Sequence, residues 1–129
     1  MEILIEQPPI LDKILKAGMK PQKTTIFAFK GKIFNPSGVD IPADILVHEE
    51  VHLKQQKGAD DDWYDRYLTD KEFRLNEEIA AFREQYKFFC EMERGRNLRA
   101  RYLDKIAKNL SSEIYGEIIS KSEVINKIK

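Results

Sequence analysis

The stretch His48-Glu49-Glu50-Val51-His52 contains both histidines of this 129-residue chain, four positions apart. Pro42 suits the first turn of a helix and Gly58 suits the position after its end, so we expect a helix over residues 42–56. Residues four apart lie one above the other on a helix, and both imidazoles therefore leave the same face. The stretch predicts a central helix that can hold one metal ion.

These five residues also match the pattern H-E-x-x-H, in which two histidines bind zinc and the glutamate is the general base of a hydrolase. Glu49 lies about 60° around the helix from His52, close to the metal position without being a ligand. A carboxylate there can take a proton from a metal-activated water. We therefore expect His48 and His52 to bind Zn²⁺ and Glu49 to be catalytic. The alternative is an ordinary helix whose two histidines are exposed or satisfied in the core.

A third ligand must come from elsewhere, because a catalytic zinc site typically has three protein ligands and one open position. The chain has no third histidine, so a carboxylate is favoured. A long helix is predicted over residues 71–94. Its apolar stripe consists of Leu75, Ile79, Phe82, Tyr86 and Phe89.

The helical phase separates two neighbouring glutamates on this long helix. Glu78 lies about 60° from the centre of the apolar stripe, and Glu77 about 160° from it. A carboxylate that borders a buried stripe is costly unless it is paired or bound to a metal. We therefore predict Glu78 as the third ligand and expect Glu77 to face solvent. Two alternatives remain: Glu77 is the ligand, or Glu78 is an exposed residue paired with Arg74 four residues earlier.

The composition indicates one globular domain over residues 1–129. Hydrophobic residues make up 42% and charged residues 34% of the chain, which is unlike a disordered tail or a membrane span. Lys+Arg and Asp+Glu number 22 each, so the net charge favours neither nucleic acid nor an anionic membrane as a partner. The single Cys90 excludes an internal disulfide framework, and the chain starts without a secretory signal. We expect a cytoplasmic location.

Other segments set the fold class. Residues 24–29 are rich in β-branched and aromatic side chains and predict a strand, which residues 32–34 continue or pair with after Gly31. Helical spacing predicts further helices in three places: around residues 63–68, over residues 98–110, and after a Ser120–Glu123 capping box. We expect an α+β fold, mostly helical. A short N-terminal β-hairpin or small sheet precedes a metal site between two core helices.

Residues 48–56, 63–68 and 73–82 together resemble the zincin metallopeptidases of the gluzincin type, in which a glutamate is the third ligand. They are most similar to small HExxH zinc metallopeptidases of phages and bacteria. The resemblance implies a minimal zincin core, zinc at His48, His52 and Glu78, and a peptide or protein substrate. Ala80 departs from the pattern, because such proteins often carry a second acid there.

The resemblance also implies how a substrate is held. In zincins a strand before the signature helix pairs with the extended substrate, so residues 26–29 or 32–34 would offer backbone hydrogen bonds. A donor to the developing oxyanion is also needed. The candidates are Tyr64, Tyr67, Tyr86 and Tyr115, which the sequence does not rank.

The expected function is zinc-dependent hydrolysis of peptide bonds. The alternative is a non-catalytic binding or assembly protein of a phage particle, which keeps zinc as a structural element or has a degenerate site. A catalytic site keeps a solvent ligand beside Glu49, whereas a structural site is closed by a fourth protein ligand. Another amide hydrolase, acting on cell-wall peptides, would share the metal chemistry and differ in substrate.

Overall fold

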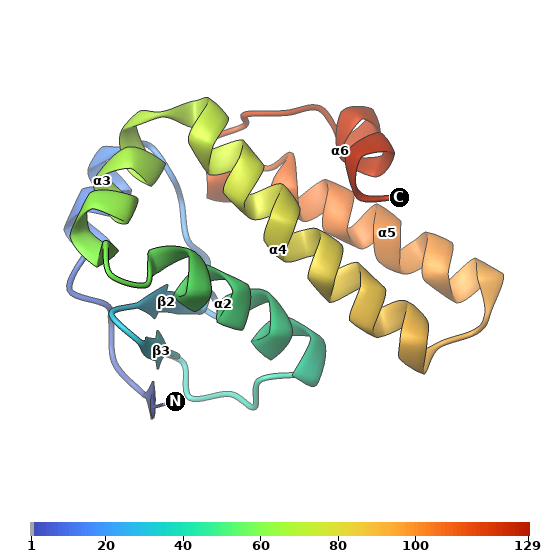
Figure 1. The fold of residues 1–129 in the computed structure, drawn as a ribbon, viewed down its shortest axis with the longest axis horizontal. Helices are drawn as coiled ribbons and strands as arrows, with labels where there is room; N and C mark the ends of the chain where they lie inside the picture. Colours follow the sequence, from blue (N-terminus) through green and yellow to red (C-terminus); the bar gives the residue numbers. More distant parts are fainter. Residues whose placement is uncertain (1) are drawn as a thin grey trace.

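The computed structural model describes residues 2–129, apart from the side chain of Asp60. In these residues a small sheet is followed by a set of packed helices (Figure 1). The elements in chain order are β1 (Glu2–Leu4), α1 (Leu11–Lys16), β2 (Phe27–Phe29), β3 (Lys32–Phe34), α2 (Ala43–Gln56), α3 (Asp60–Thr69), α4 (Lys71–Met92), α5 (Arg96–Leu110), the 3₁₀ turn η1 (Glu113–Tyr115) and α6 (Lys121–Ile128). The expected α+β, mostly helical fold class is confirmed.

The sheet has the strand order β1-β3-β2. Strands β2 and β3 are antiparallel, with Ala28 opposite Ile33, and they are joined at Lys30 and Gly31, which both have positive φ angles of 49° and 74°. Two such residues form the tight turn whose twist matches that of the flanking strands. The expected hairpin is therefore present. Strand β1 was not predicted, and it pairs in parallel with β3.

Two hydrophobic clusters lie on either side of the α2–α4 pair. The N-terminal cluster joins the sheet, α1 and α3 and consists of Ile10, Ile14, Met19, Phe27, Phe29, Phe34, Trp63, Tyr64 and Tyr67. The C-terminal cluster joins α4, α5 and α6 and consists of Phe82, Leu103, Ile106, Ala107, Leu110, Val124 and Ile128. The predicted stripe of α4 belongs to this second cluster, with Leu75, Ile79 and Tyr86 packed against it.

Helices α2 and α4 run side by side in opposite directions through the middle of the molecule (Figure 1). The buried residues of α2 are all polar: His48, Glu49, His52 and Gln56. Those of α4 include Arg74, Glu78 and Gln85. Burying a polar group costs free energy unless the group is hydrogen-bonded, paired or bound to a ligand. This polar seam between α2 and α4 is therefore the part of the fold that needs a functional explanation.

The predicted helix boundaries agree closely with the observed ones. Helix α2 begins one residue after the expected start, and Ser120 caps α6 by accepting a hydrogen bond from the backbone N–H of Glu123, as the capping box predicts. None of the helices within residues 2–129 combines the length and the apolar composition of a membrane span.

Candidate metal centre

The two histidines of α2 meet at their Nε2 atoms. These atoms lie 3.1 Å apart, and His48 and His52 are 4% and 5% exposed. The rings are tilted against each other at an interplanar angle of 77°, with centroids 4.8 Å apart. The i,i+4 spacing therefore brings both imidazoles to one point in the buried seam, as the helical phase predicts.

Glu78 reaches the same point from α4. Its Oε1 atom lies 3.1 Å from Nε2 of His48 and 3.2 Å from Nε2 of His52, and the residue is 3% exposed. The three side chains form a buried group that could hold a metal ion. A tetrahedral ion about 2.0 Å from each donor atom separates those atoms by about 3.3 Å, so the observed triangle fits zinc-like coordination.

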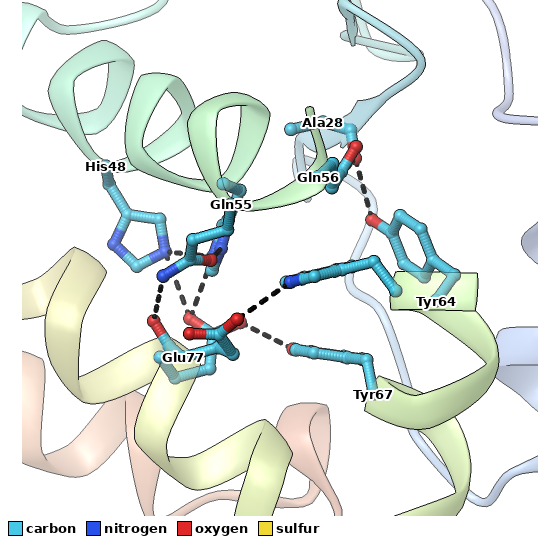
Figure 2. Close-up of polar contacts among 10 residues, drawn as sticks. Ala28, His48, Gln55, Gln56, Tyr64, Tyr67 and Glu77 are labelled. Atoms are coloured by element: carbon cyan, nitrogen blue, oxygen red, sulfur yellow. Dashed lines mark hydrogen bonds and ion pairs between the residues drawn. The ribbon is translucent and has the colours of Figure 1, made fainter. Parts of the chain in front are cut away.

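Hydrogen bonds around the group fix how two of the three side chains, His52 and Glu78, present their ligand atoms. The Oε1 atom of Gln55 lies 2.8 Å from Nδ1 of His52, and the Gln55 amide donates to the backbone carbonyl of Glu77 (Figure 2). Because that amide oxygen can only accept, Nδ1 of His52 carries a proton in every protonation state of the ring, and Nε2 is the nitrogen that can bind a metal once it loses its own proton. Tyr67 donates to Oε2 of Glu78, which leaves Oε1 for the centre (Figure 2).

The pKa shifts of His52 and Glu78 indicate that the group favours a positive charge at its centre. Burial by itself would lower the pKa of His52, but the adjacent Glu78 carboxylate raises this pKa to about 9. Burial would raise the pKa of Glu78, but His52 and His48 hold it well below its usual value. In the metal-free protein a proton supplies the positive charge, and a metal ion can replace it.

Glu49 lies beside the group and does not join it. It is 8% exposed and lines two hollows. One is a small cavity of about 60 Å³ shared with His48, His52 and Glu78, and the other is a groove of about 300 Å³ shared with His48 and Tyr115. Burial raises the pKa of the Glu49 carboxyl, although the nearby imidazoles oppose the shift.

No family model matches the chain, and neither a curated protein nor a solved structure shows significant similarity to it. The likeness to zincins therefore rests on the motif and on Glu78. The geometry of the buried group is the independent observation, and it establishes a possible metal site without assigning a reaction.

The four candidate tyrosines differ in their hydroxyl partners and in the hollows that they line. Tyr64 donates to the backbone carbonyl of Ala28, and Tyr67 donates to Glu78. Tyr86 lines a different hollow together with Cys90. Tyr115 lines both hollows that contain Glu49, and burial raises its pKa well above the usual value. Among the four, Tyr115 alone both reaches these hollows and lacks a described hydroxyl partner.

The expectation that Glu77 faces solvent was wrong. Its side chain is partly buried and accepts a hydrogen bond of 2.9 Å from the indole N–H of Trp63. The prediction considered only the apolar stripe of α4 as its buried side. Helix α3 also packs against the first turns of α4, on the side that carries Glu77. Glu77 thus connects α3 to α4 and is not one of the three converging ligands.

Arg74 was considered only as a partner of Glu78, and the structure contradicts that alternative. The Arg74 guanidinium is buried and donates to the backbone carbonyls of Tyr67, Leu68 and Tyr115. It therefore links the end of α3 to η1. The sequence carried no signal for this role, because the three carbonyls belong to segments brought together only by the fold.

One backbone carbonyl at the edge of β2 already accepts hydrogen bonds from within the protein. The carbonyl of Ala28 accepts hydrogen bonds from Gln56, at 2.7 Å, and from Tyr64, at 2.9 Å (Figure 2). A substrate strand therefore cannot use this carbonyl as the resemblance implied. Thr25 and Ile26, directly before β2, line both hollows beside Glu49.

Proposed function

We propose that the protein is a zinc-dependent hydrolase that cleaves peptide bonds, with His48, His52 and Glu78 as metal ligands and Glu49 as general base. One observation carries the proposal: three acceptor atoms converge on a buried point whose adjoining cavity contains the Glu49 carboxylate. A site that only stabilised the fold would not need an unligated carboxylate in that place.

The ligand set favours zinc in a catalytic setting. Two imidazole nitrogens and one carboxylate oxygen are a donor set of catalytic zinc sites, whereas structural sites usually have four protein ligands. Among the described residues, these three side chains are the one group of histidine, cysteine, aspartate or glutamate residues that could hold a metal ion. A bound zinc ion would supply Lewis-acid chemistry, since it makes water more acidic and polarises a carbonyl.

The protein side chains would provide the remaining functions. Glu49 would take the proton of the attacking water and return it to the leaving amine. Gln55 and Tyr67 keep His52 and Glu78 in their ligating orientations through the hydrogen bonds already described. Tyr115, which lines the groove beside Glu49, would donate a hydrogen bond to the developing oxyanion.

The test of the general base uses two adjacent glutamates. Glu49→Gln should retain zinc and lose hydrolysis of a mixed peptide library by about 10²-fold or more in kcat, because the amide cannot accept the proton. Glu50→Gln is the matched control, since Glu50 is exposed on the same helix and should keep full activity. Equal activity of the Glu49 variant and the parent would refute the assignment.

The test of the ligand set uses the neighbouring pair on α4. Elemental analysis should find close to one zinc per chain in the parent and in Glu77→Gln, because a glutamine at 77 can still accept from Trp63. Glu78→Gln should reduce zinc affinity by more than about 100-fold, because it replaces a charged ligand by a neutral one. Equal zinc affinity of the two variants would refute Glu78 as the ligand.

A non-catalytic role for zinc is the second candidate. The engagement of the Ala28 carbonyl by Gln56 and Tyr64 favours it, because it shortens the strand edge available to a substrate. In that case zinc would bind with the same ligands, and the parent protein would cleave no member of the library. The peptide assay described above therefore decides between the two candidates.

A further inference from the structure

A second polar cluster lies in the α2–α4 seam, away from the metal group. Asp44 is one turn before His48 on α2, and Gln85 is two turns after Glu78 on α4. Tyr102 of α5 connects them. Gln85 donates from Nε2 to the Tyr102 hydroxyl at 2.8 Å, and Tyr102 donates to the carboxylate of Asp44.

This chain of hydrogen bonds leaves one atom without a partner. The Oε1 atom of Gln85 is buried and makes no hydrogen bond among the described residues, and the residue is 4% exposed. Rotating the amide would not help, because the Tyr102 proton already goes to Asp44 and a carboxylate can only accept. A buried acceptor left unpaired is destabilising, so a donor from outside the protein would stabilise it.

Gln85 lies where a bound substrate would pass. It lines the groove of about 300 Å³ that contains His48 and Glu49. It also lines an adjoining hollow of about 400 Å³ that contains Asp44 and Tyr102. The seven residue steps from Glu78 to Gln85 span about 10 Å along the helix, which corresponds to about three residues of extended peptide.

We propose that Oε1 of Gln85 accepts a main-chain N–H of the peptide substrate, about three residues from the bond that is cleaved. This inference rests on the proposed function and adds a specificity-determining subsite to it. A neutral N–H is favoured over a basic side chain, because Lys105 and Lys108 line the same hollow. The subsite would make the enzyme prefer substrates long enough to reach Gln85.

The experiment replaces single amides of a substrate by esters, which removes one N–H at a time. A mixed library first identifies a peptide that the zinc-loaded parent cleaves, and esters are then placed at successive positions on both sides of the cleaved bond. In the parent, an ester two to four residues away should lower kcat/KM by about tenfold. In Gln85→Met, which lacks the acceptor, the same ester should cause no loss. Gln7→Met is the matched control, because Gln7 is exposed and lines neither the groove nor the adjoining hollow, and it should respond to the ester as the parent does.

The outcomes distinguish the two proposals. If the parent cleaves no peptide, the proposed function fails and this inference fails with it. If a peptide is cleaved but no ester two to four residues away lowers kcat/KM, the inference alone is overturned. The same holds if the ester effect persists in Gln85→Met. Should that variant fail to fold, the position of the ester effect in the parent decides the question.

Discussion

At His52, one ring nitrogen is hydrogen-bonded to Gln55 and the other faces Glu78. The raised pKa of about 9 means that the ring carries a proton at pH 7 in the metal-free protein. Zinc binds the neutral ring only, so each ion must displace this proton. We expect zinc affinity to rise about tenfold per pH unit between about pH 6.5 and 8.5, with about one proton released per ion at pH 7.

Isothermal titration calorimetry in two buffers of different ionisation enthalpy counts the released protons. Constant zinc affinity across this pH range, with no proton release, would contradict the prediction.

Because the folded-state pKa of His52 exceeds its unfolded value, its pairing with Glu78 stabilises the metal-free fold fully below about pH 6.5. That contribution is lost as the pH rises through about 9.

Individual residues differed in how far the sequence could place them. Helical phase alone predicted that Glu78, and not Glu77, joins the two histidines, because both glutamates lie on one continuous helix and their relative angle is local geometry. The hydrogen bond between Trp63 and Glu77 could not be foreseen, since it depends on where α3 packs. For the same reason the four tyrosines could be named and not ranked.

At the scale of elements, Gly116 allows η1 to approach α4. It has a φ of +85°, and a Cβ built there would lie 2.8 Å from the Arg74 guanidinium. We expect Gly116→Ala to destabilise the fold by more than about 2 kcal/mol, because it adds left-handed strain and displaces the donor to the Tyr115 carbonyl. Urea denaturation of the metal-free protein measures this loss.

Gly31→Ala is the control that measures the effect of left-handed backbone strain alone. Gly31 also has a positive φ, of +74°, but no atom lies within 4 Å of the position that a Cβ would take there. The Gly31→Ala variant should lose only about 1 kcal/mol of unfolding free energy, from this strain. Equal losses at the two glycines would show that the contact with Arg74 contributes nothing.

Helices were more predictable than strands for a physical reason. The periodicity and the stop signals of α2, α4 and α5 are local, so their ends agree with the expected ends within two residues. Strand β1 pairs with β3, which follows about thirty residues later, and a three-residue segment carries too little pattern to reveal this. The turn η1 was not predicted, because the hydrogen bond from Arg74 to the carbonyl of Tyr115 joins segments that only the fold brings together.

At the scale of the whole molecule, the metal group lies between the two hydrophobic clusters. Zinc would join α2 to α4 across their polar seam, so its binding should stabilise the fold. With free zinc at about 1,000 times Kd the gain is about 4 kcal/mol, which raises Tm by on the order of 10 °C. Thermal unfolding with zinc and with a chelator measures this difference.

Glu78→Gln is the control for this effect, because it removes one ligand while keeping the shape of the side chain. At the same free zinc concentration, a 100-fold loss of affinity leaves a gain of only about 1.4 kcal/mol, so the variant should show a much smaller difference in Tm between zinc and chelator than the parent. An unchanged Tm of the parent on chelation would mean that zinc does not bind the folded protein more tightly than the unfolded chain.

The wholly polar burial of α2 has an evolutionary consequence. His48, Glu49, His52 and Gln56 are the side chains that this helix buries, so the residues proposed for the chemistry also fill its buried interface. Replacing one member of a buried polar group leaves its partners unpaired, which is costly, so a descendant that had stopped cleaving anything would keep much of the motif. Retention of the motif among such descendants would be a poor guide to which of them are still enzymes.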